Sequence, residues 1–205
     1  MTDFAAIRNA IIEGNRDAVQ ALVTAAVEGR EDAGRILDQG MIPAMREMGD
    51  RFSRNEAYVP ELLVAARAMQ AGLSILEPLL ADSGRVPRGR VAIGTVKGDL
   101  HDIGKNLVGI MIKGAGYEVI DLGVNCDIVK FEEGVAQGAQ VIACSSLLTT
   151  TMSYMREVVN HFKGRGVRVI IGGAPITQAY CDEIGADGCA DDANGAVLLL
   201  DRLLA

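Results

Sequence analysis

The chain has no tryptophan, only two histidines and only four cysteines among its 205 residues. The cysteines are Cys126, Cys144, Cys181 and Cys189, and no two of them form a Cys-x-x-Cys pair. The ligand spacing of zinc fingers is therefore absent. A disulfide framework is not expected in a chain of this length. We expect four reduced thiols, most of them buried as small apolar side chains.

Positive charge is also scarce, because 20 Lys and Arg residues stand against 27 Asp and Glu residues, for a net charge of −7. Nucleic acids and anionic membranes attract clustered Lys and Arg, so this balance argues against both as primary partners. No apolar run approaches the length that spans a bilayer. The first residues, Met1-Thr2-Asp3, lack the basic and apolar segments of an export signal. We expect a cytoplasmic protein.

Residues 1–82 contain no convincing strand and carry apolar residues at helical spacing. Thr2 and Asn15 are the predicted N-caps of the first two helices, and Gly29 is the predicted C-terminal stop of the second. Pro43 is expected to kink the third helix, and the fourth helix is expected to begin near Pro60. Four amphipathic helices with short connections predict a four-helix bundle. Residues 83–89 contain serine, proline and two glycines, which indicates a linker to a second domain over residues 90–205.

After the linker, short β-branched runs alternate with helical stretches. The predicted strands are Val91–Thr95, Glu118–Leu122, Val141–Cys144, Arg168–Ile171 and a short one near Gly188. The predicted helices are Ile103–Lys113, Ile128–Ala136, Met152–Lys163, Ile176–Glu183 and Ala193–Leu204. Right-handed crossovers return each strand in the same direction. The sequence therefore predicts an α/β fold, a flavodoxin-like, Rossmann-like, doubly wound sheet of five parallel strands, preceded by the all-α bundle.

One of the two histidines, His101, lies in the loop after the first predicted strand, two residues after Asp99. A carboxylate bonded to one ring nitrogen fixes the tautomer and leaves the other nitrogen free for a metal. A single histidine cannot hold a bare zinc or iron ion, but it can be an axial ligand of a metal in a macrocycle. In this fold, ligands bind at the carboxyl ends of strands 1 and 3, where His101 and Ser145 are expected.

The pattern Asp99-x-His101-x-x-Gly104 resembles the D-x-H-x-x-G signature of cobalamin-binding domains. The wider run from Gly94 to Asn106 is similar to a segment of cobalamin-dependent methionine synthase and of small corrinoid proteins in anaerobic methyltransferase systems. Two more blocks follow in the family's order, Ser145-Ser146-Leu147 and Gly172-Gly173. The first motif alone would occur by chance, whereas three ordered blocks at predicted strand ends make the resemblance specific.

The resemblance implies a base-off, His-on cobalamin with His101 as the lower axial ligand of cobalt and Asp99 as the partner of that histidine. In methionine synthase a serine extends this pair, and Thr151 stands at the matching position here with an added methyl group. Ser145 would bond the detached base, and the two glycines would leave room for the nucleotide tail. The implied cofactor-binding residues are Asp99, His101, Asp102, Ile103, Gly104, Ser145, Leu147, Thr149, Thr151, Gly172 and Gly173.

The helical half resembles the family's cap domain, which covers the upper face of the corrin with apolar residues such as Tyr58, Val59 and Leu62 here. It contains no histidine, so the upper face is left free for a methyl group. The resemblance implies a methylcobalamin carrier that shuttles a methyl group on cobalt from a donor methyltransferase to an acceptor methyltransferase, for instance one using tetrahydrofolate. A reductive activator protein is a further implied partner.

Two alternative functions share parts of this layout. Cobalamin-dependent sensors carry an added DNA-binding or signalling module and typically have tryptophan and histidine in the cap, which this chain lacks. Cobalamin subunits of carbon-skeleton mutases normally lack a helical cap of this type. Nucleotide hydrolysis is excluded, because the glycine-rich loop is one residue too long for a phosphate loop and Asn106 stands where serine or threonine is needed.

The same residues have simpler interpretations. A loop histidine is most often only hydrogen-bonded, Ser145 can cap a turn, and the double glycine can form an ordinary strand-to-helix turn. Tyr58 and Leu62 are equally consistent with the core of the bundle. His161 lies in a polar helical stretch and is expected to be exposed.

Overall fold

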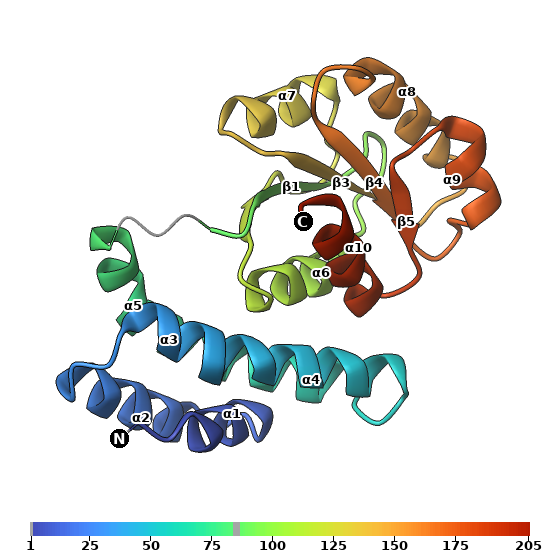
Figure 1. Ribbon diagram of the computed structural model, residues 1–205. Helices are drawn as coiled ribbons and strands as arrows, with labels where there is room; N and C mark the ends of the chain where they lie inside the picture. Colours follow the sequence, from blue (N-terminus) through green and yellow to red (C-terminus); the bar gives the residue numbers. More distant parts are fainter. Residues whose placement is uncertain (1, 84–86) are drawn as a thin grey trace. The chain divides into compact units, whose positions relative to one another are not determined.

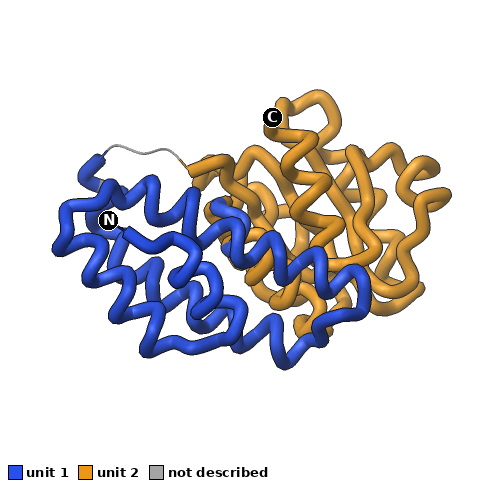
Figure 2. The backbone as a smooth tube through the Cα atoms, turned by 60° about the horizontal axis from the view of Figure 1, so that its bottom comes forward, with its two compact units in different colours: residues 1–86, 114–116 blue, residues 87–113, 117–205 orange. Residues whose placement is uncertain are grey.

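The computed structural model describes residues 2–83 and 87–205 and divides into two compact units (Figures 1 and 2). Unit 1 comprises residues 1–86 together with residues 114–116, and unit 2 comprises residues 87–113 and 117–205. The linker predicted at residues 83–89 falls partly outside the described residues, at residues 84–86.

Unit 1 is built from helices. They are α1 (Phe4–Ile12), α2 (Arg16–Glu28), α3 (Ala33–Arg35), the π-helical segment η1 (Ile36–Met41), α4 (Ile42–Ser53) and α5 (Val59–Asp82). The segments α3, η1 and α4 follow one another without a break and together form the predicted third helix. Helix α1 packs against α2 and α4, and α5 packs against the same two helices, as in a four-helix bundle.

The helix ends of unit 1 agree with the sequence-based predictions at some positions and differ at others. Asn15 caps α2 by accepting a hydrogen bond from the backbone of Ala18, as predicted. The N-cap of α1 is Asp3 and not Thr2, because the Asp3 carboxylate is the group that accepts from the first helical turn. Pro43 lies in the first turn of α4, and the distortion predicted for it falls in the preceding turn, which winds as a π-helix.

Helix α5 is the one described helix that, by length and composition alone, could cross a membrane, over Val59–Leu80. The expectation that no apolar segment reaches this length was therefore wrong. Buried core helices pass the same test, and Leu62, Met69 and Leu76 of α5 have at most 2% of their surface exposed.

Unit 2 contains one sheet of five parallel strands in the order β2-β1-β3-β4-β5. The strands are β1 (Arg90–Thr95), β2 (Glu118–Asp121), β3 (Val141–Ser145), β4 (Arg168–Gly172) and β5 (Gly188–Ala190). The order is that of flavodoxin-like folds, in which the chain reverses its winding direction between the first and third strands. The predicted fold class is confirmed, the first four strands lie within one residue of their predicted bounds, and the short fifth strand begins at Gly188 as expected.

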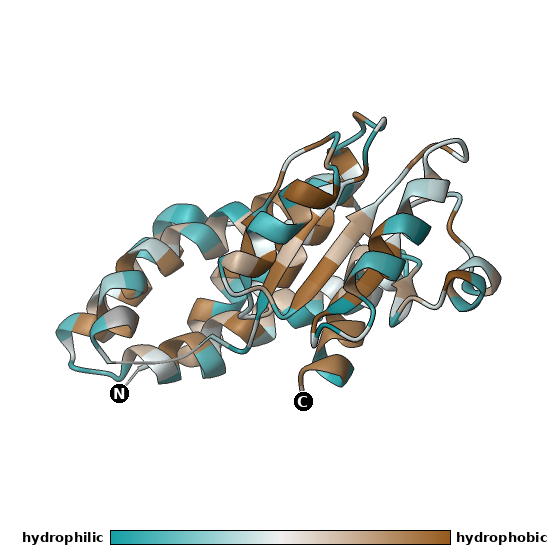
Figure 3. Ribbon diagram, turned by 90° about the horizontal axis from the view of Figure 1, so that it is seen from above, coloured by the Kyte–Doolittle hydropathy of each residue, from teal (hydrophilic) through white to brown (hydrophobic). Residues whose placement is uncertain are grey.

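Five helices of unit 2 enclose the sheet. They are α6 (Ile103–Gly114), α7 (Ile128–Ala136), α8 (Met152–Phe162), α9 (Gln178–Ile184) and α10 (Ala193–Leu203). Helices α6 and α10 cover one face and α7, α8 and α9 the other (Figure 1). The central strands are almost entirely apolar (Figure 3), which is expected for strands buried on both faces.

The four cysteines belong to this unit and are all free thiols. Cys126, Cys144 and Cys181 are buried, and Cys189 is partly buried. The expectation that most of the cysteines are buried is confirmed, and the expectation that they are reduced stays a prediction.

Candidate functional site

The carboxyl edge of the sheet brings the predicted motifs together. Thr95 at the end of β1 pairs with Ser145 at the end of β3, and Ser145 pairs with Gly172 at the end of β4. The loops that follow these strands therefore begin side by side. His101 is in the loop after β1, and Thr151 closes the loop after β3.

Asp99 holds His101 at this edge. The Nδ1 atom of His101 lies 2.7 Å from Oδ1 of Asp99, and the backbone N–H of His101 donates to the same oxygen at 3.0 Å. An ionised carboxylate only accepts hydrogen bonds, so Nδ1 carries the proton and Nε2 of the neutral ring presents a lone pair. The carboxylate has no exposed surface, whereas 52% of the imidazole is exposed. Within the described chain, Nε2 has no hydrogen-bond partner.

The second carboxylate oxygen of Asp99 is held by the loop after β3. It accepts from the backbone N–H groups of Leu147 at 2.8 Å and Leu148 at 3.3 Å. The hydroxyls of Thr151 and Ser146 also lie within hydrogen-bond distance of this oxygen, at 3.1 Å and 3.3 Å. Sequence reasoning placed Thr151 here but missed Ser146, which is completely buried.

These hydrogen bonds decide the charge of Asp99. Burial by itself raises the pKa of a carboxyl group, because it penalises the charged form. Here the backbone N–H groups of His101 and Leu147 and the side chains of His101 and Thr151 outweigh burial and hold the pKa of Asp99 well below its ordinary value. Asp99 is therefore a permanent anion behind the imidazole.

The backbone around His101 is fixed from two neighbouring strands. The buried hydroxyl of Thr95 donates to the carbonyl of His101 at 2.8 Å. From the loop after β2, Asn125 accepts from the N–H of Gly98 at 2.8 Å and donates its own N–H to the carbonyl of Asp99 at 3.0 Å. Sequence reasoning assigned neither Thr95 nor Asn125 a role. The only available signal was that Asn tolerates the left-handed conformation that residue 125 adopts, with φ of 51°.

Lys105 in the first turns of α6 has a side chain that is only 2% exposed, and its ammonium lies 2.6 Å from Asp121 at the end of β2. A buried lysine needs such a partner to remain charged. Burial opposes ionisation of Asp121, but hydrogen bonds from Lys105 and from the N–H of Gly123 outweigh it and lower the pKa of Asp121. This pair fastens α6 to the sheet close to His101.

The two glycines after β4 differ in what they require. A Cβ on Gly173 would lie 1.9 Å from the carbonyl oxygen of Ser146, and φ is 132°, so glycine is demanded by the protein's own backbone. A Cβ on Gly172 would meet only the carbonyl of Ala190 at an ordinary 3.4 Å. Protein atoms therefore leave space beside Gly172, and across the described residues the adjacent Ser145 hydroxyl has no hydrogen-bond partner. An open side and an unengaged hydroxyl fit a bulky group at this edge.

The other predicted residues lie on the exposed rim. Asp102 accepts from the Asn106 side chain at 3.1 Å, Gly104 has open space where a Cβ would be, and Thr149 is exposed. The exposed large apolar side chains around His101 are Leu100, Ile103, Leu147 and Leu148, exposed by 71, 81, 45 and 41%. These apolar side chains belong to or directly follow the two loops that hold Asp99 and His101.

In unit 1, Tyr58 and Val59 at the start of α5 are exposed by 65% and 37%, whereas Leu62 is completely buried. The Glu61 carboxylate accepts from the N–H of Tyr58 at 2.7 Å and so fixes this helix start. Leu62 is thus a core residue. The expectation that Tyr58 and Val59 face the corrin stays a prediction.

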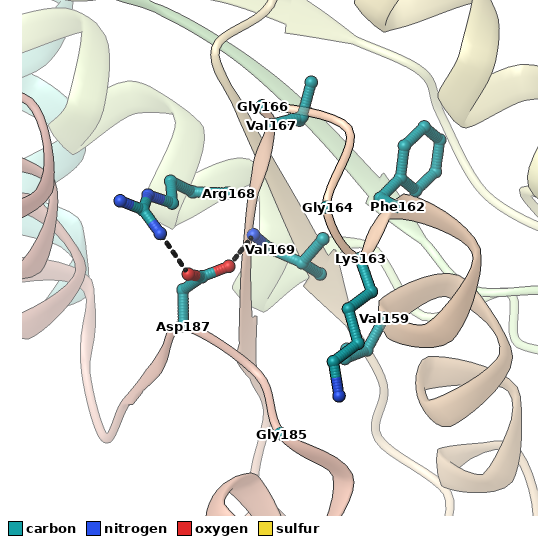
Figure 4. A pocket seen from close by; sticks show the side chains of 10 residues that line it. All are labelled: Val159, Phe162, Lys163, Gly164, Gly166, Val167, Arg168, Val169, Gly185 and Asp187. Carbon is teal, nitrogen blue, oxygen red and sulfur yellow. Dashed lines mark hydrogen bonds and ion pairs between the residues drawn. The ribbon is translucent and has the colours of Figure 1, made fainter.

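Other polar clusters lie away from this edge. A pocket of about 390 Å³ lies at the opposite end of β4, where Arg168 donates to Asp187 (Figure 4). His161 is paired with Glu132 at 2.8 Å and its side chain is only 24% exposed, so the expectation of an exposed residue was wrong. No group of three or more His, Cys, Asp or Glu side chains in the described ranges could hold a bare metal ion.

Comparison with known proteins identifies the group that suits this edge. A family model described as a B12-binding domain matches residues 89–200, and a second B12-binding domain model matches residues 4–77. The chain belongs to the B12-binding family. Its cofactor is accordingly a corrinoid, and the chain resembles the corrinoid proteins of methylamine and methanol methyltransferase systems.

Curated relatives of this B12-binding protein match over nearly their whole length. A corrinoid protein of Desulfitobacterium hafniense (strain Y51) is 39% identical over 97% of this chain and 95% of its own. Dimethylamine corrinoid protein 1 of Methanosarcina acetivorans is 40% identical over 97% and 96%.

Two solved structures match the fold of the B12-binding protein. One is a cobalamin-binding protein of Desulfitobacterium hafniense DCB-2, with a TM-score of 0.80, 28% identity and 98% of both chains covered. The other is the methanol:cobalamin methyltransferase complex of Methanosarcina barkeri, with a TM-score of 0.85, 26% identity, and coverage of 98% of this chain and 79% of that chain.

Proposed function

We propose that this protein carries a methyl group between two methyltransferases on a corrinoid bound base-off, with His101 as the lower ligand of cobalt. The observation that carries the proposal is the Asp99–His101 pair. It directs the proton to Nδ1 and leaves the lone pair of Nε2 free to bind a metal, on an imidazole that is half exposed. The corrinoid supplies a cobalt atom that accepts a methyl group and releases it to an acceptor.

The protein's own residues hold and orient this group. The permanent charge of Asp99 keeps the imidazole in one tautomer and strengthens Nε2 as a donor. Thr95 and Asn125 keep the loop from shifting when the ligand bond forms. The Ser145 hydroxyl and the open side of Gly172 would receive the detached base and its tail, and Ile103 and Leu147 would exclude water from the lower face of the ring.

Partners follow from the relatives. Because the matching proteins include dimethylamine and trimethylamine corrinoid proteins, the donor partner is a methyltransferase that acts on a methylated small molecule. The acceptor partner is a second methyltransferase, with tetrahydrofolate or a thiol receiving the methyl group. A reductive activator would restore cobalt that has been oxidised. We place this exchange in the cytoplasm.

Electron paramagnetic resonance of the protein reconstituted with cob(II)alamin tests the ligation. With ¹⁵N-labelled protein and unlabelled cobalamin, a histidine ligand gives two-line splitting from ¹⁵N, whereas the cofactor's own base gives three lines from ¹⁴N. The wild type should show two lines, and His101→Ala should lose them. His161→Ala is the matched control, since its imidazole is engaged by Glu132, and it should keep the wild-type signal. Three lines in the ¹⁵N wild type would refute the proposal.

A further inference from the structure

We infer that Ser146, together with Thr151, is a positioning residue that sets how strongly Asp99 pulls on the imidazole of His101. The inference rests on the proposed ligation, and it adds a hydroxyl pair in which a proton can occupy either of two positions. Ser146 does not touch the imidazole, so it acts through the carboxylate alone.

The two hydroxyls are mutually close and share their acceptors. Ser146 Oγ lies 2.7 Å from Thr151 Oγ1. Both also lie within reach of the Asp99 carboxylate, at 3.3 and 3.1 Å. Both lie within reach of the carbonyl of Leu148 as well, at 3.1 and 2.9 Å.

Proton counting limits what this cluster can do. Each hydroxyl has one proton to donate. The 2.7 Å contact uses one of the two protons, so a single proton remains for either the Asp99 carboxylate or the Leu148 carbonyl. The pair therefore has one state that adds a hydroxyl hydrogen bond to Asp99 and one state that adds none.

The cluster is also held rigidly. Ser146 has no exposed surface, and its N–H donates to the carbonyl of Gly172 at 3.1 Å. On its other side, the Ser146 carbonyl occupies the space where Gly173 lacks a Cβ. A buried hydroxyl packed this closely cannot turn to solvent, so its proton has to stay within the cluster.

The consequence for the histidine follows from charge. Each hydrogen bond that Asp99 accepts from a hydroxyl spreads its negative charge and weakens its hold on the Nδ1 proton. In the wild type, the hydroxyl that donates to Asp99 also accepts from its neighbour, which polarises it and strengthens its bond to the carboxylate. In Ser146→Ala, the single proton of Thr151 is still divided between Asp99 and the closer Leu148 carbonyl, but this polarisation is lost, so the carboxylate becomes more basic. The imidazole then donates more electron density through Nε2, which favours the more oxidised cobalt.

The test uses Ser146→Ala with Ser153→Ala as the matched control, because the Ser153 hydroxyl lies in the next helix and reaches only the carbonyl of Thr150. The midpoint potential of the bound cob(II)alamin couple should become more negative in Ser146→Ala. A tenfold change in the equilibrium, an upper expectation, corresponds to about 59 mV for one electron. In the protein without corrinoid, the Nδ1 proton resonance of His101 should move downfield.

Variants at Thr151 guard against a folding defect in Ser146→Ala. Thr151→Val should shift the potential in the same direction, and Thr151→Ser, which keeps the hydroxyl, should restore the wild-type value. Combining Ser146→Ala with Thr151→Val should give a non-additive effect on the unfolding equilibrium constant of more than about twofold. An unchanged potential and an unchanged Nδ1 resonance in Ser146→Ala would overturn the inference. Loss of the two-line ¹⁵N signal in the wild type would instead overturn the proposed ligation, and the resonance would still test the hydroxyl pair.

Discussion

At the scale of single residues, the site depends on contacts between side chains that are far apart in the chain. The carboxylate of Asp99 is held by donors 47 to 52 positions later, and Gly98 is held by Asn125, which lies 27 positions later. The donors are short hydroxyl side chains and backbone N–H groups, as suits a loop that must hold one imidazole still. Of the polar atoms of His101, only Nε2 is left without a hydrogen-bond partner among the described residues.

Asn125 gives a prediction at this scale. Asn125→Ala removes the bond to Gly98 and also forces a side chain without local hydrogen bonds into a left-handed conformation. Asn125→Gly removes the same bond but accepts the conformation freely. We expect the alanine variant to lose about 1 kcal/mol more unfolding free energy than the glycine variant, as measured in urea. Equal losses would show that residue 125 carries no backbone strain.

Some of these residues could be predicted from the sequence and others could not. Asp99, His101 and Thr151 were found because a short motif and a family resemblance point to them. Ser146 and Asn125 were missed because their roles arise from contacts across the sheet edge, and no local pattern reports such contacts. Leu62 was assigned to the cap face, but its side chain is completely buried.

At the scale of elements, the strand ends set the function. The five strands were predictable because their β-branched runs alternate with amphipathic helices, and the parallel order then follows from right-handed crossovers. The sequence predicted a distortion of the helix at Pro43 but not that it would be a π-helical segment. A proline indicates only that regular helical hydrogen bonding is interrupted, and the packing of the helix decides the type and position of the distortion.

The two glycines at the end of β4 provide a matched test of this edge. Gly173→Ala would place a methyl group inside the carbonyl of Ser146, and we expect a loss of about 2 kcal/mol or more in unfolding free energy. Gly172→Ala should stay within about 1 kcal/mol of the wild type, because its methyl group meets no protein atom closer than 3.4 Å. Corrinoid affinity, followed by absorbance titration, should nevertheless fall in Gly172→Ala. Unimpaired binding would show that the cofactor does not occupy this space.

At the scale of the whole molecule, the two family matches, at residues 4–77 and 89–200, correspond to the helical unit and to the sheet unit. Among the ion pairs that join different elements of the second unit, the Lys105–Asp121 pair between α6 and β2 has an almost fully buried cation.

This pair predicts a pH dependence of stability. The pKa of Asp121 is lower in the folded protein than its ordinary value, so its contribution is fully present above about pH 4 and is lost as the pH falls further. In Asp121→Asn that part of the acid loss should disappear. At pH 7 the variant should be less stable by about 1 kcal/mol, because the buried ammonium of Lys105 loses its partner. The effect is no larger because Asp121 is more than half exposed, and water screens its attraction to Lys105. Urea unfolding between pH 3 and 7 measures both effects, and parallel curves for the two proteins would contradict the prediction.

The buried cysteines of the sheet unit have a chemical consequence for a methyl carrier. Burial raises the pKa of Cys126 and Cys144, and it raises the pKa of Cys181 to about 12. Thiolates are the nucleophilic form, so these three sulfurs are inert toward alkylation at neutral pH. In the proposed methyl carrier, these three thiols would therefore not consume the electrophilic one-carbon unit, which would be kept for the acceptor enzyme.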